Sequence, residues 1–165
     1  MSTTFVTLTR EAPGKDPGFW MSDGMLEVWL RLLALHLPEP HHSGEHVATL
    51  KIRNQWLLAS RGYCVGCVPH GLEEACTTQE GRAVVRIAID SLLSALGRTE
   101  TPLDAHTLNL LGIEGGVFTA PIERKWLQDI GQAFIDLLDG KIIGTASTAE
   151  VMPGSHTYKR SITTG

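Results

Sequence analysis

Apolar side chains recur every three or four positions between residues 77 and 138, and this spacing limits what the chain can fold into. The recurring residues are Val85, Ile89, Leu92 and Leu96, then Ile122, Trp126, Ile130, Phe134 and Leu137. Such a period places side chains along one face of an α-helix. We therefore expect two amphipathic helices that share one interior. Gly131 inside the second run costs roughly 1 kcal/mol relative to Ala, so we expect another element to approach it closely.

Boundary signals indicate where these helices begin and end. Thr77 and Glu80 match a capping box, in which each side chain accepts a hydrogen bond from a backbone N–H of the first turn. The earlier of these two helices, the third of the chain, is therefore expected over 77–97, where it ends on a glycine. Prolines at the favoured first position open a short helix over 102–112 and a longer one over 121–138.

The N-terminal half adds two helices and a strand. A segment that is apolar on nearly all sides predicts a central, buried helix over 22–37. A second helix is expected over 45–61, although its apolar spacing also permits a strand there. Residues 3–9 are rich in β-branched side chains and predict a strand. Residues 141–147 are a second, shorter strand candidate.

Together these elements predict an α+β chain that is mostly α. About five helices would pack around one core, with a small β-sheet from the N- and C-terminal segments. The length of 165 residues suits one domain. We assign residues 1–152 to a single helix-rich domain and residues 153–165 to a polar C-terminal tail.

Composition narrows the class of partner. Lys and Arg number 14 against 18 Asp and Glu, and the basic residues are scattered, which argues against nucleic-acid binding. The longest apolar segment, 25–37, contains Glu27, Arg31 and His36 and is too short to span a bilayer. No secretory leader is recognisable in the first ten residues. We therefore expect a cytoplasmic protein that binds a protein partner or itself, with neither nucleic acid nor membrane as partner.

A cysteine and histidine cluster is the one candidate metal site. Cys64, Cys67, His70 and Cys76 form the pattern C-x2-C-x2-H-x5-C, and three thiolates with one imidazole would complete a tetrahedral zinc site. Its length resembles a zinc knuckle, but His70 lies nearer to the second cysteine than in that motif, and no function is inferred from the resemblance. The alternatives are buried cysteines that serve packing alone and a redox-active C-x-x-C pair.

An aromatic segment precedes the first helix. Phe19, Trp20 and Met21 stand just before the expected helix cap. Apolar side chains there either staple the incoming chain onto the core or form an exposed patch for a partner.

No linear signature of catalysis is present. The sequence lacks G-x-S-x-G, H-E-x-x-H, a Walker loop and G-x-G-x-x-G. We expect a non-enzymatic, soluble binding or regulatory module that acts through protein contacts, as an adaptor, a scaffold that self-associates or an inhibitor, and that needs no cofactor. The alternatives are a small zinc-binding protein, and a small-molecule-binding domain or an enzyme without a linear motif.

Overall fold

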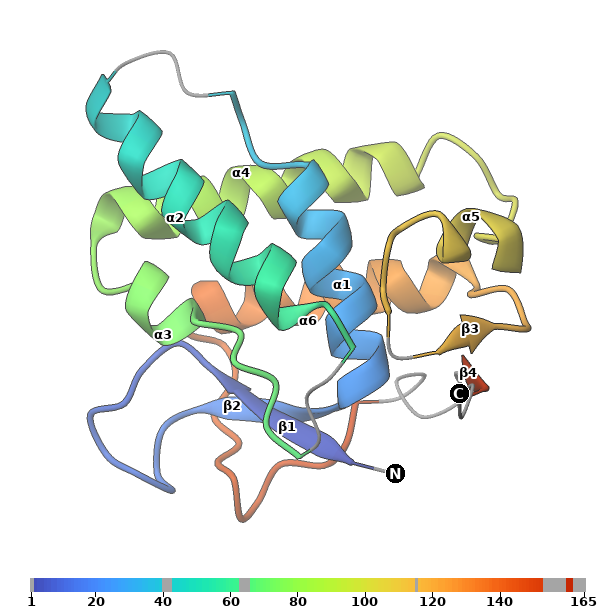
Figure 1. Ribbon diagram of the computed structural model, residues 1–165. Helices are drawn as coiled ribbons and strands as arrows, with labels where there is room; N and C mark the ends of the chain where they lie inside the picture. The colour runs from blue at the N-terminus through green and yellow to red at the C-terminus, as the bar shows by residue number, and fades with distance from the viewer. Residues whose placement is uncertain (1, 40–42, 63–65, 115, 153–159, 162–165) are drawn as a thin grey trace.

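The computed structural model describes residues 2–39, 43–62, 66–114, 116–152 and 160–161, and within them the chain is mostly helical (Figure 1). The elements in chain order are β1 (Thr3–Thr7), β2 (Gly18–Ser22), α1 (Asp23–Leu35), α2 (Ser43–Ala59), α3 (Leu72–Ala75), α4 (Gln79–Leu96), α5 (Ala105–Asn109), β3 (Val117–Phe118), α6 (Arg124–Leu138) and β4 (Arg160–Ser161). The expected α+β class with predominant helix is confirmed.

Helix α1 occupies the centre of the fold. It contacts α2, α4 and the hairpin of β1 and β2, and Figure 1 shows it passing between the other long helices. Trp29 on α1 is fully buried, and its ring centroid lies 5.4 Å from that of Phe134 on α6. The apolar character of α1 on nearly all sides thus matches a helix with neighbours on every side.

Helices α4 and α6 pack together through the two apolar stripes. Val85, Ile89, Ile130 and Phe134 are all buried, as their spacing predicts. At Gly131 an added Cβ would lie 2.5 Å from Leu93 Cδ2 on α4, so α4 approaches α6 at the residue that has no side chain. The expected close approach is therefore confirmed.

The cap of α4 differs from the expected capping box. Thr78, not Thr77, is the N-cap, and its hydroxyl accepts the N–H of Gly81 at 3.0 Å. Thr77 instead donates its hydroxyl to the Glu74 carbonyl at 2.7 Å. The sequence did not predict the short helix α3, which ends at Ala75, shortly before Thr77. The Thr77 hydroxyl satisfies a carbonyl at the C-terminal end of that helix.

The helices expected at 102 and 121 begin later than their prolines suggest. Leu103 and Ile122 form an antiparallel bridge, with backbone hydrogen bonds of 2.9 and 2.8 Å. This pairing keeps both residues extended, so α5 starts after Asp104 and α6 after Glu123. Tertiary pairing here outweighs the helical preference of the segments.

The strands also depart from expectation. β2 covers Gly18–Ser22, which includes residues expected to precede the first helix as a loop, and pairs antiparallel with β1, with Phe5 opposite Trp20. Residues 141–147 form no strand; they attach to β2 through single contacts such as Gly18 N–H to the Gly144 carbonyl, 2.8 Å. One edge of β2 pairs with β1. At the other edge of β2, the C-terminal segment adds only a bridge between Trp20 and Val151. Of the tail 153–165, only 160–161 are described, as β4 beside β3.

Replacing Gly81 by Ala tests the packing of α4 against α3. An added Cβ would lie 1.8 Å from the Ala75 carbonyl oxygen, and backbone cannot move aside cheaply. We expect Gly81→Ala to lower the free energy of unfolding by about 2 kcal/mol in urea denaturation. The control is Gly97→Ala, where the nearest atom is 3.5 Å away and φ is −75°; it should be neutral or slightly stabilising. Equal stability of the two variants would contradict this packing.

Candidate functional site

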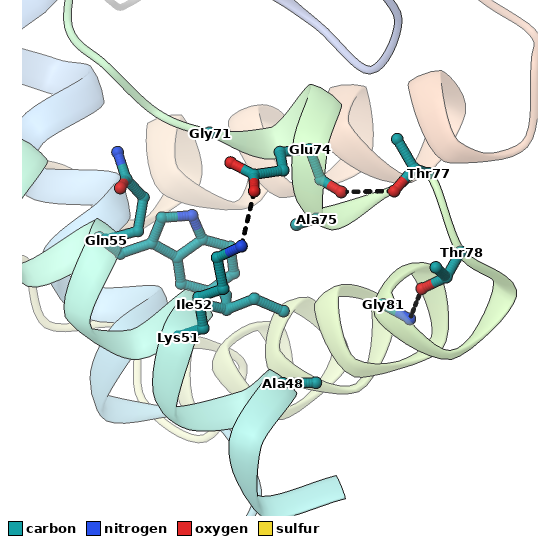
Figure 2. A pocket seen from close by; sticks show the side chains of 11 residues that line it. Ala48, Lys51, Ile52, Gln55, Gly71, Glu74, Ala75, Thr77, Thr78 and Gly81 are labelled. Carbon is teal, nitrogen blue, oxygen red and sulfur yellow. Dashed lines mark hydrogen bonds and ion pairs between the residues drawn. The ribbon is translucent and has the colours of Figure 1, made fainter. Parts of the chain in front are cut away.

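A pocket of about 240 Å³ lies between α2, α3 and the first turn of α4 (Figure 2). Most of its lining is apolar side chain or glycine backbone. The lining residues are Ala48, Lys51, Ile52, Gln55, Trp56, Gly71, Glu74, Ala75, Thr77, Thr78 and Gly81. We call it the apolar pocket.

Two hydrogen bonds from α2 hold the turn that forms one wall of the apolar pocket. The Trp56 indole N–H donates to the His70 carbonyl at 3.1 Å, and the Gln55 amide donates to the Pro69 carbonyl at 2.6 Å. Gly71 follows with φ +64°, and a Cβ there would lie 2.8 Å from Gln55 Cγ. Glycine is favoured at this position both by its left-handed backbone and by the close approach of α2. The turn therefore places α3 opposite α2 with a space between them.

An ion pair crosses the mouth of the apolar pocket. Figure 2 shows Lys51 of α2 reaching Glu74 of α3, with Nζ 2.6 Å from Oε1. Both side chains are 70% exposed. The hydrogen bond and charge of Lys51 lower the pKa of Glu74 below its ordinary value. Solvent screens such exposed pairs, so this one opens at little free-energy cost.

The polar groups of the apolar pocket are already engaged. Thr77 donates to the Glu74 carbonyl, Thr78 accepts the N–H of Gly81, and the described lining residues include no charge besides Lys51 and Glu74. A general base or nucleophile needs a free, activated group aimed at a substrate. Among the described residues that line the pocket, no such group is present, and most of the wall offers apolar contact.

A second, more open hollow of about 690 Å³ adjoins the apolar pocket. Its residues come from the segment after β1, from α3 and the turn that follows it, and from the start of α4, and we call it the charged hollow. They are Leu8, Thr9, Arg10, Glu11, Glu73, Glu74, Cys76, Thr77 and Arg82. Glu74 and Thr77 line both spaces, so α3 is the wall between them.

His70 joins β1 to α3 from a buried position. Its Nε2 lies 3.3 Å from the Phe5 carbonyl oxygen, and its Nδ1 accepts the N–H of Leu72 at 3.2 Å. Burial lowers the pKa of His70 below its ordinary value, and the nearby Glu73 carboxylate opposes part of that shift. Because Nδ1 accepts the Leu72 N–H, the ring proton belongs on Nε2, which faces the Phe5 carbonyl oxygen.

The candidate zinc ligands occupy different environments. Cys67 is exposed, Cys76 is buried, and Cys64 lies outside the described residues. Among the residues that are described, no three His, Cys, Asp or Glu side chains are grouped as metal ligands would be. Zinc binding by Cys64, Cys67, His70 and Cys76 stays a prediction, and it would require His70 to give up its bond from Leu72 or that to Phe5.

The candidate interaction patch lies mostly in the core. Phe19 and Met21 are buried, and Phe19 packs edge-on against Phe134 at 5.4 Å between ring centroids. Trp20 is half-buried on Phe5, and its indole N–H donates to the Ala146 carbonyl at 2.9 Å. A partner contact at Trp20 stays a prediction.

Sequence reasoning did not anticipate the apolar pocket. Its residues come from three segments, and no linear pattern joins them. Two signals were present: Gly71 and Gly81, which permit close approach on opposite sides of α3, and Trp56, a large side chain on the inner face of α2.

The comparisons with known proteins add no family: no family model, curated protein or solved structure matches this chain. None of the described helices combines the length and the apolar character that crossing a membrane requires.

The buried thiol of Cys76 should resist alkylation in the folded protein. Burial raises its pKa to about 11, which leaves fewer than about one thiol in a thousand ionised at pH 7.5. A pulse of iodoacetamide, read by fragment-ion mass spectrometry, should modify exposed Cys67 and leave Cys76 unmodified until urea unfolds the chain. Equal modification of the two cysteines without urea would contradict the buried position.

The zinc hypothesis predicts a metal that survives purification. A closed site with three thiolates and one imidazole should retain about one zinc per chain when no metal is added. Elemental analysis measures the ratio directly. A ratio near zero would exclude the cluster as a structural zinc site.

Proposed function

We propose that this chain is a non-enzymatic binding module that recognises a protein partner by taking one bulky apolar side chain into the apolar pocket. The observation that carries the proposal is a mainly apolar space whose two charged residues, Lys51 and Glu74, are paired with each other. Its volume of about 240 Å³ lies below the roughly 300–1,000 Å³ of most small-molecule sites. A space of that size suits one Leu, Phe or Trp side chain.

The outer face of α2 adds two exposed apolar side chains, Val47 and Leu58, beside this pocket. Val47, Lys51, Asn54 and Leu58 follow one another at helical spacing, and all four are exposed. Val47 is 69% and Leu58 62% exposed, at the two ends of this face. They lie roughly 16 Å apart along the helix axis, a length that a short partner segment can cover. Figure 1 shows α2 on the outside of the helical layer.

This arrangement resembles the general anatomy of protein interfaces. Binding energy concentrates in a few large side chains that fill pockets, and less critical contacts surround them and exclude water. In this protein the apolar pocket would take the large central side chain of the partner. The α2 face would make the surrounding contacts that exclude water. The net charge of −4 suits a soluble partner-binding protein, and it adds no preference for nucleic acid.

Titration with single blocked amino acids tests the proposed function. N-acetyl-phenylalanine amide and N-acetyl-leucine amide should shift the backbone amide resonances of Gly71 and Gly81 saturably, at millimolar concentrations. N-acetyl-serine amide should not, because it has no apolar side chain to bury.

Two tryptophan variants make this test specific. Ala48→Trp fills the apolar pocket and should abolish the shifts, because Ala48 lines it. Ser94→Trp adds the same side chain at an exposed position of α4 outside the pocket and should leave binding unchanged. Absence of saturable binding to the wild-type chain, or full binding to folded Ala48→Trp, would exclude the proposed function.

A further inference from the structure

The apolar pocket and the charged hollow are neighbours that share α3 as a wall. Glu74 and Thr77 line both, and on α4 the pocket residue Gly81 is followed directly by the hollow residue Arg82. A polypeptide that places one side chain in the pocket can therefore place a neighbouring residue at the hollow.

Most charges of the hollow are already paired. Glu73 forms an ion pair with Arg10 through Oε1, and Glu74 forms one with Lys51. The Glu73 Oε2 lies 3.2 Å from His70 Nδ1 and has no hydrogen-bond partner within the described part of the chain. Arg82 differs, because its guanidinium donates to the neutral Leu138 carbonyl at 3.0 Å. It has no carboxylate partner among the residues that the structure describes.

Arg82 and Glu11 are the two charges that remain, and their surroundings differ. Glu11 is exposed and forms no ion pair within the described part of the chain, so water and salt screen it strongly. Arg82 is half-buried at the base of α4, where screening is weaker. Arg82 therefore favours an anionic group placed directly beside it, and two other carboxylates that line the hollow, the exposed Glu11 and the largely buried Glu73, weaken that preference.

We propose that the partner segment carries an Asp or Glu close in sequence to its apolar anchor, and that this carboxylate pairs with Arg82 while the anchor occupies the apolar pocket. The inference rests on the proposed function and specifies the partner: an acidic peptide segment with one bulky apolar residue. An extended peptide advances about 3.3–3.6 Å per residue, so the separation of anchor and acid is a measurable variable.

A peptide series measures both the preference and the separation. The peptides are acetyl-Phe-Glu-amide and versions with one, two or three glycines between Phe and Glu, each paired with its Gln analogue. Affinities come from the shifts of the Gly71 and Gly81 amides. At the best separation we expect Glu to bind about three- to fivefold more tightly than Gln in low salt. In 0.5 M NaCl the two should be nearly equal.

Four variants test whether Arg82 causes the tighter binding of the Glu peptides. Arg82→Gln should remove it, Arg82→Lys should keep part of it, and Glu11→Gln should increase it by removing a repelling charge. Arg98→Gln changes an exposed arginine that does not line the hollow and should leave the preference unchanged. If Arg82→Gln does not fold, the salt dependence and the Glu11→Gln variant still decide the question.

The outcomes separate this inference from the function beneath it. Equal binding of Glu and Gln peptides at every separation, or a preference that survives in Arg82→Gln, overturns the acidic partner, while binding of N-acetyl-phenylalanine amide leaves the apolar pocket as the recognition site. If no peptide and no blocked amino acid binds, both proposals fail.

Discussion

Burial of α1 along most of its length is the constraint on which the rest of the structure depends. Trp29 lies against Phe134, and Gly131 of α6 has no side chain at the point where Trp29 and Leu93 approach. A fully buried large side chain contributes on the order of 2–3 kcal/mol, and it does so only if close-packed neighbours surround it. Helices α2, α4 and α6 and the hairpin are arranged to meet that condition.

A buried charge at the start of α1 then organises the segment that leads to the site. Asp23 accepts hydrogen bonds from the Thr4 hydroxyl and the Gly66 N–H, both at 2.7 Å, and the Thr4 oxygen accepts the Val68 N–H at 2.8 Å. Burial of a carboxylate is unfavourable unless donors satisfy it. By supplying those donors, the hairpin and residues 66–68 are tied to α1, and His70 and α3 follow in a defined position.

The apolar pocket results from two attachments of the segment before α3. Residues 66–68 are tied to α1, and the His70 and Pro69 carbonyls are bound by α2. Trp56 and Gln55 hold the carbonyls of His70 and Pro69, which sets α3 apart from α2 while Gly81 lets α4 approach α3. The space that remains has apolar walls and an exposed ion pair at its mouth. Affinity there would come from apolar burial, and selectivity would come from the charges at the rim and in the adjoining hollow. This division of roles is typical of recognition sites.

The long helices could be read from the sequence because their signal is local. Side chains three and four residues apart share a face whatever the rest of the chain does, so the stripes through Val85 and Ile130 predict buried helical faces correctly. Helix ends were harder to predict. Thr77 and Thr78 are both suitable caps. Thr78 is the N-cap in the structure because the Thr77 hydroxyl is hydrogen-bonded to the Glu74 carbonyl. Only the tertiary structure decided the pairing of Leu103 with Ile122, the pairing of β2 with β1, and the apolar pocket. Each depends on where separate segments meet, and contacts between residues far apart in the chain leave no periodic trace in the sequence.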